Sequence, residues 1–118
     1  MNLFDTTQLG LERAVAGASM RQATLAGNIA NANTPGYQRR DVDFHSALSA
    51  AMQGGRGAVD QVAFKPETDA AAAMRADGNS VDIDVESAKL ASNALEYEAL
   101  VAVTRGRIDV LESAMGVR

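Results

Sequence analysis

Two short stretches of this chain hold the side chains that could do chemistry. The first contains the only histidine, His45, which follows Asp41 and Asp43, and a carboxylate beside an imidazole can serve as a general base. No recognisable nucleophile motif accompanies them, whereas a catalytic site needs several groups that converge on one substrate. A lone histidine of this kind is more typical of a surface or an interface. We therefore predict no catalytic residues and no enzyme activity.

The second stretch, residues 77–86, is rich in carboxylates and could be taken for a calcium-binding loop. Its acidic residues are Asp77, Asp82, Asp84 and Glu86. In an EF-hand loop the ligands lie at fixed positions relative to one glycine. With Gly78 in that role, two ligand positions fall on Ala73 and Arg75, whose side chains do not bind calcium. A turn followed by a helix cap explains the stretch better, so we expect no metal site and no cofactor.

Phosphate and nucleic acid ligands are also disfavoured. The glycine-rich residues 54–57 lack the Lys-Ser/Thr pair and the preceding strand of a phosphate-binding loop, and we expect an adaptable loop there. The chain has 11 basic and 15 acidic residues, a net charge of −4, and no basic patch. We therefore expect neither a nucleic acid partner nor a small-molecule substrate. With no cysteine, the chain can form neither disulfides nor thiolate metal sites.

The most specific signal is the stretch from Asn28 to Tyr37, which ends a long helical pattern. Pro35 cannot continue a helix and disfavours the α conformation for the residue before it. Thr-Pro-Gly-Tyr fits a type II turn, in which Gly36 takes a positive φ. The asparagines are either local caps or partners for neighbouring subunits, because a buried amide needs hydrogen bonds. We predict a turn motif and subunit interface formed by Asn28, Ile29, Asn31, Asn33, Thr34, Pro35, Gly36 and Tyr37.

Two strings in the sequence resemble a known family. Asn-Ile-Ala-Asn-x-x-Thr-Pro-Gly-Tyr, continued by Gln-Arg-Arg-Asp-Val-Asp-Phe at 38–44, is similar to the N-terminal signature of the axial proteins of the bacterial flagellum. That family comprises rod, hook and hook-associated subunits. Asp-Gly-Asn-x-Val-Asp-x-Asp-x-Glu at 77–86 resembles the start of the C-terminal helix in the rod proteins. The likeness covers the N-terminal third or so and roughly residues 77–111, and the short chain resembles the proximal rod subunits most.

The resemblance implies a structural subunit that polymerises through its terminal helices around the export channel and transmits torque. The implied partners are copies of itself, other rod subunits, the adaptor between rod and membrane ring, and the export gate at the rod base. The implied location is the proximal rod of the basal body, in the periplasm. Residues 1–5 show neither the basic nor the apolar region of a secretory signal peptide. The resemblance accordingly implies export by the flagellar type III system without a cleaved signal.

The residues themselves predict one all-α domain spanning 1–118. Aromatic residues are only 4% of the chain, so helix-on-helix packing is expected rather than a sandwich or barrel. We predict two long terminal helices, 6–33 and 84–116, packed antiparallel as a coiled-coil-like hairpin. The middle segment, 34–83, is expected to be short and irregular, with a brief helix at 46–53 and a helical turn at 70–76.

Apolar periodicity supports both long helices. Asp5 and Gln8 have the spacing of a capping box, and a 4-3 stripe then runs from Phe4 to Ala32. The C-terminal helix carries two stripes, 90–115 and 85–102. A helix with two apolar faces needs cover from more than one side, which one partner helix cannot supply. The residues predicted to pack are Leu11, Val15, Leu25, Leu90, Leu95, Tyr97, Val101, Ile108 and Leu111.

The surplus apolar face favours assembly but does not identify the assembly. Besides a rod subunit, a small cytoplasmic helical hairpin that serves as an export chaperone or adaptor would fit. Such a protein would bury its stripes in a stable dimer.

Overall fold

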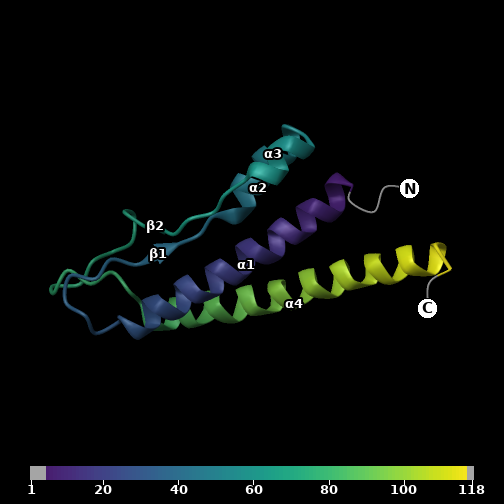
Figure 1. The fold of residues 1–118 in the computed structure, drawn as a ribbon. Helices are drawn as coiled ribbons and strands as arrows, with labels where there is room; N and C mark the ends of the chain where they lie inside the picture. The colour runs from purple at the N-terminus through teal and green to yellow at the C-terminus, as the bar shows by residue number, and fades with distance from the viewer. Residues whose placement is uncertain (1–4, 117–118) are drawn as a thin grey trace.

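The computed structural model describes residues 5–116, and Phe4 of the expected stripe lies outside them. The elements follow in the order α1 (Thr6–Ala30), β1 (Arg40–Asp41), α2 (Phe44–Gln53), α3 (Arg56–Gln61), β2 (Glu67–Thr68) and α4 (Ile83–Ala114). The two long helices α1 and α4 lie side by side and antiparallel (Figure 1). The middle segment returns along the other side of α1. The all-α hairpin predicted from the sequence is therefore confirmed, and α1 is its central element.

The start and end of α1 follow from its caps. The Asp5 carboxylate accepts a hydrogen bond from the Gln8 backbone N–H at 2.8 Å, which satisfies one of the free donors of the first turn. The helix ends at Ala30 instead of the expected residue 33. Asn31 is the reason, because its side-chain amide donates to the Gly27 carbonyl at 2.9 Å and thereby competes with further helical hydrogen bonds.

The first turn of α4 is also capped as the sequence indicated. The Asp82 carboxylate accepts hydrogen bonds from the backbone N–H groups of Asp84 and Val85 at 3.0 and 3.3 Å. Asp84 and Glu86 place negative charge in the first turn, where the helix dipole favours it. None of the helices in residues 5–116 combines the length and apolarity that a membrane span requires.

The middle segment is more ordered than predicted. The expected short helix begins earlier, at Phe44, because the Asp43 carboxylate caps it by accepting from the Ser46 N–H at 3.2 Å. Helix α3 and the antiparallel pair β1–β2 were not foreseen, and residues 70–76 form a turn rather than a helix. Gly55 takes a φ of 85° and is the N-cap of α3, so it lies at a helix start between α2 and α3.

An aromatic contact packs the start of α2 on α1. Phe44 is 1% exposed and packs in a small core with Ala14, Ala18 and Val42. Its ring lies directly over Gly17, where an added Cβ would come within 2.6 Å of the Phe44 Cβ and Cγ atoms. Gly17 weakens α1 as an isolated helix, but it gives Phe44 the space to reach the helix backbone.

This contact predicts opposite effects for two glycines of α1. Gly17→Ala should destabilise the chain by about 1–3 kcal/mol, because the new methyl group overlaps Phe44 in a packed core. Gly27→Ala should be neutral or stabilising by up to about 1 kcal/mol, because no atom lies within 4 Å of its added Cβ and alanine favours helix. Urea unfolding followed by circular dichroism measures both. Equal stabilities for the two variants would contradict the packing of Phe44 on Gly17.

Candidate functional site

The Asn28–Tyr37 motif forms the predicted type II turn. The Tyr37 N–H donates to the Thr34 carbonyl at 3.2 Å, and Gly36 between them has a φ of 75°. The positive φ explains why glycine follows proline here, since a residue with a Cβ is strained in that conformation.

The turn is held by the second string of the sequence analysis. The Gly36 N–H donates to the Asp77 carbonyl at 2.9 Å, and Asn79 donates its side-chain amide to the carbonyls of Asn31 and Thr34 at 2.9 and 2.8 Å. A Cβ on Gly78 would lie 3.3 Å from the Gly36 Cα, so the two backbones meet at close range. The two strings that resemble the rod proteins are thus one structural unit at the closed end of the hairpin.

Asn28 is the centre of a buried polar network at this end. Its side chain is fully buried and uses its full hydrogen-bonding capacity within the chain. The amide nitrogen donates to the Arg40 carbonyl at 2.7 Å and to Glu86 Oε2 at 3.1 Å. The amide oxygen accepts from the Arg40 N–H at 3.0 Å and from the Tyr37 hydroxyl at 3.1 Å. Asn28 therefore belongs to the interior, not to a subunit interface, and Asn31 is a local cap; Asn33 is exposed.

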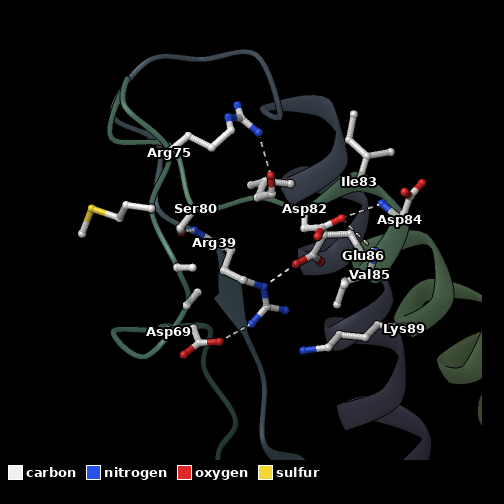
Figure 2. A pocket seen from close by; sticks show the side chains of 14 residues that line it. Arg39, Asp69, Arg75, Ser80, Asp82, Ile83, Asp84, Val85, Glu86 and Lys89 are labelled. Atoms are coloured by element: carbon white, nitrogen blue, oxygen red, sulfur yellow. Dashed lines mark hydrogen bonds and ion pairs between the residues drawn. The ribbon is translucent and has the colours of Figure 1, made fainter.

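Arg39 and Glu86 form the charged part of the network. Arg39 is 5% exposed and Glu86 1%, and the Arg39 Nε donates to Glu86 Oε1. The remaining nitrogens donate to Asp69 at 2.7 Å and to Asp41 at 3.2 Å, and Figure 2 shows the guanidinium between Asp69 and Glu86. Burial alone would lower the pKa of Arg39, but the hydrogen bonds to Glu86, Asp69 and Asp41 outweigh it and raise the pKa. The guanidinium thus stays charged in the interior.

A second arginine ties α1 to the same network. Arg21 donates to both oxygens of Asp41, with Nε–Oδ1 at 2.8 Å and Nη2–Oδ2 at 3.2 Å. Burial tends to raise the pKa of Asp41, but this bidentate pair and the Val42 N–H lower it overall. The pKa of Asp69 is also lowered, first by its hydrogen bond from Arg39.

An open pocket of about 820 Å³ lies beside this network, between the 69–75 loop and the start of α4 (Figure 2). Its charged floor, Arg39, Asp69 and Glu86, is already paired within the chain. No cluster of three potential metal ligands occurs among residues 5–116. The three paired residues of this floor hold segments of the chain together.

His45 likewise lacks a catalytic setting. It is exposed, stacks on Phe44 with ring centroids 4.1 Å apart, and contacts Glu96 of α4 through Nε2. The two neighbouring carboxylates are engaged elsewhere, Asp41 with arginines and Asp43 as the cap of α2. The geometry agrees with the prediction that His45 is a surface residue.

The contact line of α4 on α1, called the seam here, runs along the edge of the first predicted apolar stripe, whose residues Leu90, Val101 and Leu111 are half-buried. It follows Glu86, Asn93, Leu100 and Arg107, which are spaced seven residues apart. Asn93 donates to the Ala18 carbonyl at 2.8 Å, and the Arg107 Nε donates to Gln8 Oε1 at 3.2 Å. Three of these four seam residues are polar, and the half-buried Leu90, Val101 and Leu111 lie on or beside the seam, whereas Val85, Val103 and Val110 lie on one exposed side of it.

The predicted packing residues are distributed accordingly. On α1, Leu25 is fully buried, and Leu11 and Val15 are half-buried. On α4, Leu90, Val101 and Leu111 are half-buried, while Tyr97 and Ile108 remain 37% and 41% exposed. Leu95 is 69% exposed and does not pack within the chain.

Two apolar surfaces flank the seam. On one side a groove of about 510 Å³ between α1 and α4 is lined by Ser19, Gln22, Ala23, Ala26, Ala94, Tyr97 and Glu98. On the other side is the valine flank, Val85, Val103 and Val110, which are 47%, 53% and 67% exposed. Sequence reasoning found the apolar residues but missed the polar seam, whose only sequence signal is the heptad spacing of Glu86, Asn93, Leu100 and Arg107.

These features define a class of protein. Within residues 5–116 the buried charges pair with one another, and α4 keeps apolar surface exposed on both sides of its seam. These are features of a structural subunit that packs against other helices. A family model for the flagella basal body rod protein matches residues 11–38. The chain is 38% identical to the flagellar basal body rod protein FlgB of Escherichia coli K12, over 80% of this chain and 85% of that protein. It is 32% identical to FlgB of Bacillus subtilis 168, over 98% and 97%.

The chain belongs to the FlgB family of flagellar basal body rod proteins. The family is structural and not enzymatic, in agreement with the absence of a catalytic site predicted from the sequence.

The network makes a prediction for two asparagines of the same motif. Asn28→Ala should destabilise the chain by at least about 1–3 kcal/mol, because Glu86 and the Arg40 backbone lose buried hydrogen bonds. Asn33→Ala should change stability by no more than about 0.5 kcal/mol, because Asn33 is exposed. Denaturant unfolding of both variants provides the measurement. A neutral Asn28→Ala would show that the network does not stabilise the closed end.

The lowered pKa values of Asp41 and Asp69 predict acid sensitivity. A carboxyl whose folded-state pKa is depressed stabilises the fold above its ordinary value of 3.8 and loses that contribution as pH falls toward the folded value. The free energy of unfolding should therefore fall between about pH 5 and 2. The difference in unfolding free energy between wild type and Asp41→Asn should narrow over that range. Asp60→Asn, which removes an exposed carboxylate charge on α3, is the matched control for the loss of charge. A constant gap for Asp41→Asn would contradict the role of this pair.

Proposed function

We propose that this chain is a subunit of the proximal rod that polymerises through α1 and α4 around the export channel and passes torque to its neighbours. The observation that carries the proposal is the exposure of aliphatic side chains on both sides of the α4 seam. These side chains have no packing partner within the hairpin, and contiguous exposed apolar surface is typical of interaction sites.

The surface area of the chain supports assembly. It exposes 7182 Å², whereas a compact monomer of 12.3 kDa exposes about 6,100 Å². The surplus of about 1,100 Å² exceeds the roughly 800 Å² that each partner contributes to an interface of standard size. An elongated shape of 61 × 29 × 14 Å accounts for the surplus and leaves long sides available for neighbours.

The closed-end network suits transmission of force. It joins α1, the turn, β1 and α4 through charge-assisted hydrogen bonds, which hold their relative positions. As partners we propose further copies, other rod subunits, the adaptor between rod and membrane ring, and the export gate. The position in the periplasm and export by the type III route without a cleaved signal are parts of the same proposal. Family membership favours this function over the export chaperone or adaptor.

A charge on the valine flank should separate folding from assembly. Val110→Glu should keep the circular dichroism and unfolding free energy of the wild type, because Val110 is 67% exposed. In a strain that lacks its own FlgB, this variant should fail to enter basal bodies and to restore swimming, since a buried unpaired carboxylate costs several kcal/mol at each contact.

Two controls accompany this experiment. Gln53→Glu adds the same charge on exposed α2 and should restore swimming, as should His45→Ala, which loses only a surface pair. Leu25→Glu is not a test of the interface, because Leu25 is fully buried and the variant should not fold. Normal swimming of Val110→Glu would refute the role of this flank.

A further inference from the structure

We infer that copies of this chain stack heterologously, with the valine flank of one copy seated in the α1–α4 groove of the next. The inference rests on the proposed rod function and specifies which face meets which. The two surfaces lie on opposite sides of the seam.

Helical periodicity separates the two surfaces. Val85, Val103 and Val110 are about five and two turns apart, so they line up along one side of α4. Ala94 and Tyr97, which line the groove, face the other side of the seam. Because the surfaces differ, a copy bound through one keeps the other free, and the contact repeats without closing.

The shapes of the two surfaces are complementary. Four of the seven residues that line the groove have small side chains and leave room for a ridge, and larger side chains border it; the small ones are Ser19, Ala23, Ala26 and Ala94, and the larger ones are Gln22, Tyr97 and Glu98. The valine flank is such a ridge, with branched side chains that stand out from α4. Helices commonly associate by packing a ridge of side chains on one helix into a groove on the other.

The second copy is the occupant that the surface area supports. The surplus of about 1,100 Å² is larger than one partner's share of a standard interface, so the exposed surface suffices for one standard contact with a second copy or for two smaller ones. When Val103 of one copy lies over Ala94–Tyr97 of a parallel neighbour, the two copies are offset by about seven residues. This offset is on the order of 10 Å along the helix axis. The overhang of α4 beyond Arg107, which contacts the start of α1, then lies against the next copy.

Cysteine crosslinking tests the inference directly, because the chain has no cysteine of its own. Val103→Cys and Ala23→Cys are combined in one chain, expressed in a strain that lacks its own FlgB, and treated with a short bismaleimide in purified basal bodies. We expect a ladder of dimers, trimers and larger species from the double variant. Each single variant should give none, and Val103→Cys with Ala50→Cys on exposed α2 should give none.

Other outcomes overturn the inference. Dimers from Val103→Cys alone would show that valine flanks face each other. Absence of a ladder, with the chain present in the basal bodies, would show that another rod protein covers the flank and would leave the proposed function intact. If the double variant is absent from basal bodies although the wild type enters them under the same conditions, the same crosslinking is done on the purified double variant at high concentration. A missing ladder there refutes the inference. If the wild type itself does not enter basal bodies, the proposed function fails with it.

Discussion

The structure depends on one buried guanidinium. Arg39 leaves water on folding, and its charge is tolerable only because Glu86, Asp69 and Asp41 surround it. Two of these carboxylates come from distant parts of the chain, Glu86 at the start of α4 and Asp69 directly after β2. Both segments must therefore lie beside Arg39 before its guanidinium is fully paired. Removing one partner from such a group is costlier than never having buried it, because an uncompensated charge remains. The network therefore specifies an arrangement more than it adds net stability.

Polar contacts also determine how α4 lies on α1. A seam of Glu86, Asn93 and Arg107 fixes the register of α4 on α1, since each polar group finds its partner at only one offset. An apolar seam would bury more surface but would tolerate sliding by a turn. Because these seam positions are polar, several aliphatic side chains of α4, among them Leu95, Val103 and Val110, stay exposed.

Local signals predicted much of this fold. Asp5 and Asp82 as caps, and Pro35 with Gly36 as a type II turn, are short-range effects that the sequence states directly. The buried network could not be predicted, because Arg39 and Glu86 are 47 residues apart and look like surface residues in any periodic pattern. The seam was missed for a related reason, since apolar periodicity cannot detect a contact line that is mostly polar. Gly17 weakens an isolated helix, and nothing in the nearby sequence indicates that Phe44, 27 residues away, packs upon it.

The polar ties of the hairpin are distributed unevenly along its length. The closed end holds a dense buried network, whereas the far end of α4 is joined to α1 through Arg107, Asp5 and Gln8, with both members of the ion pair partly exposed. Mechanically this is a cantilever, clamped at one end and compliant at the other. A sideways load on the distal part of α4 bends it away from α1 while the clamped end keeps its geometry. Such a beam is stiff only when its free end is braced from outside.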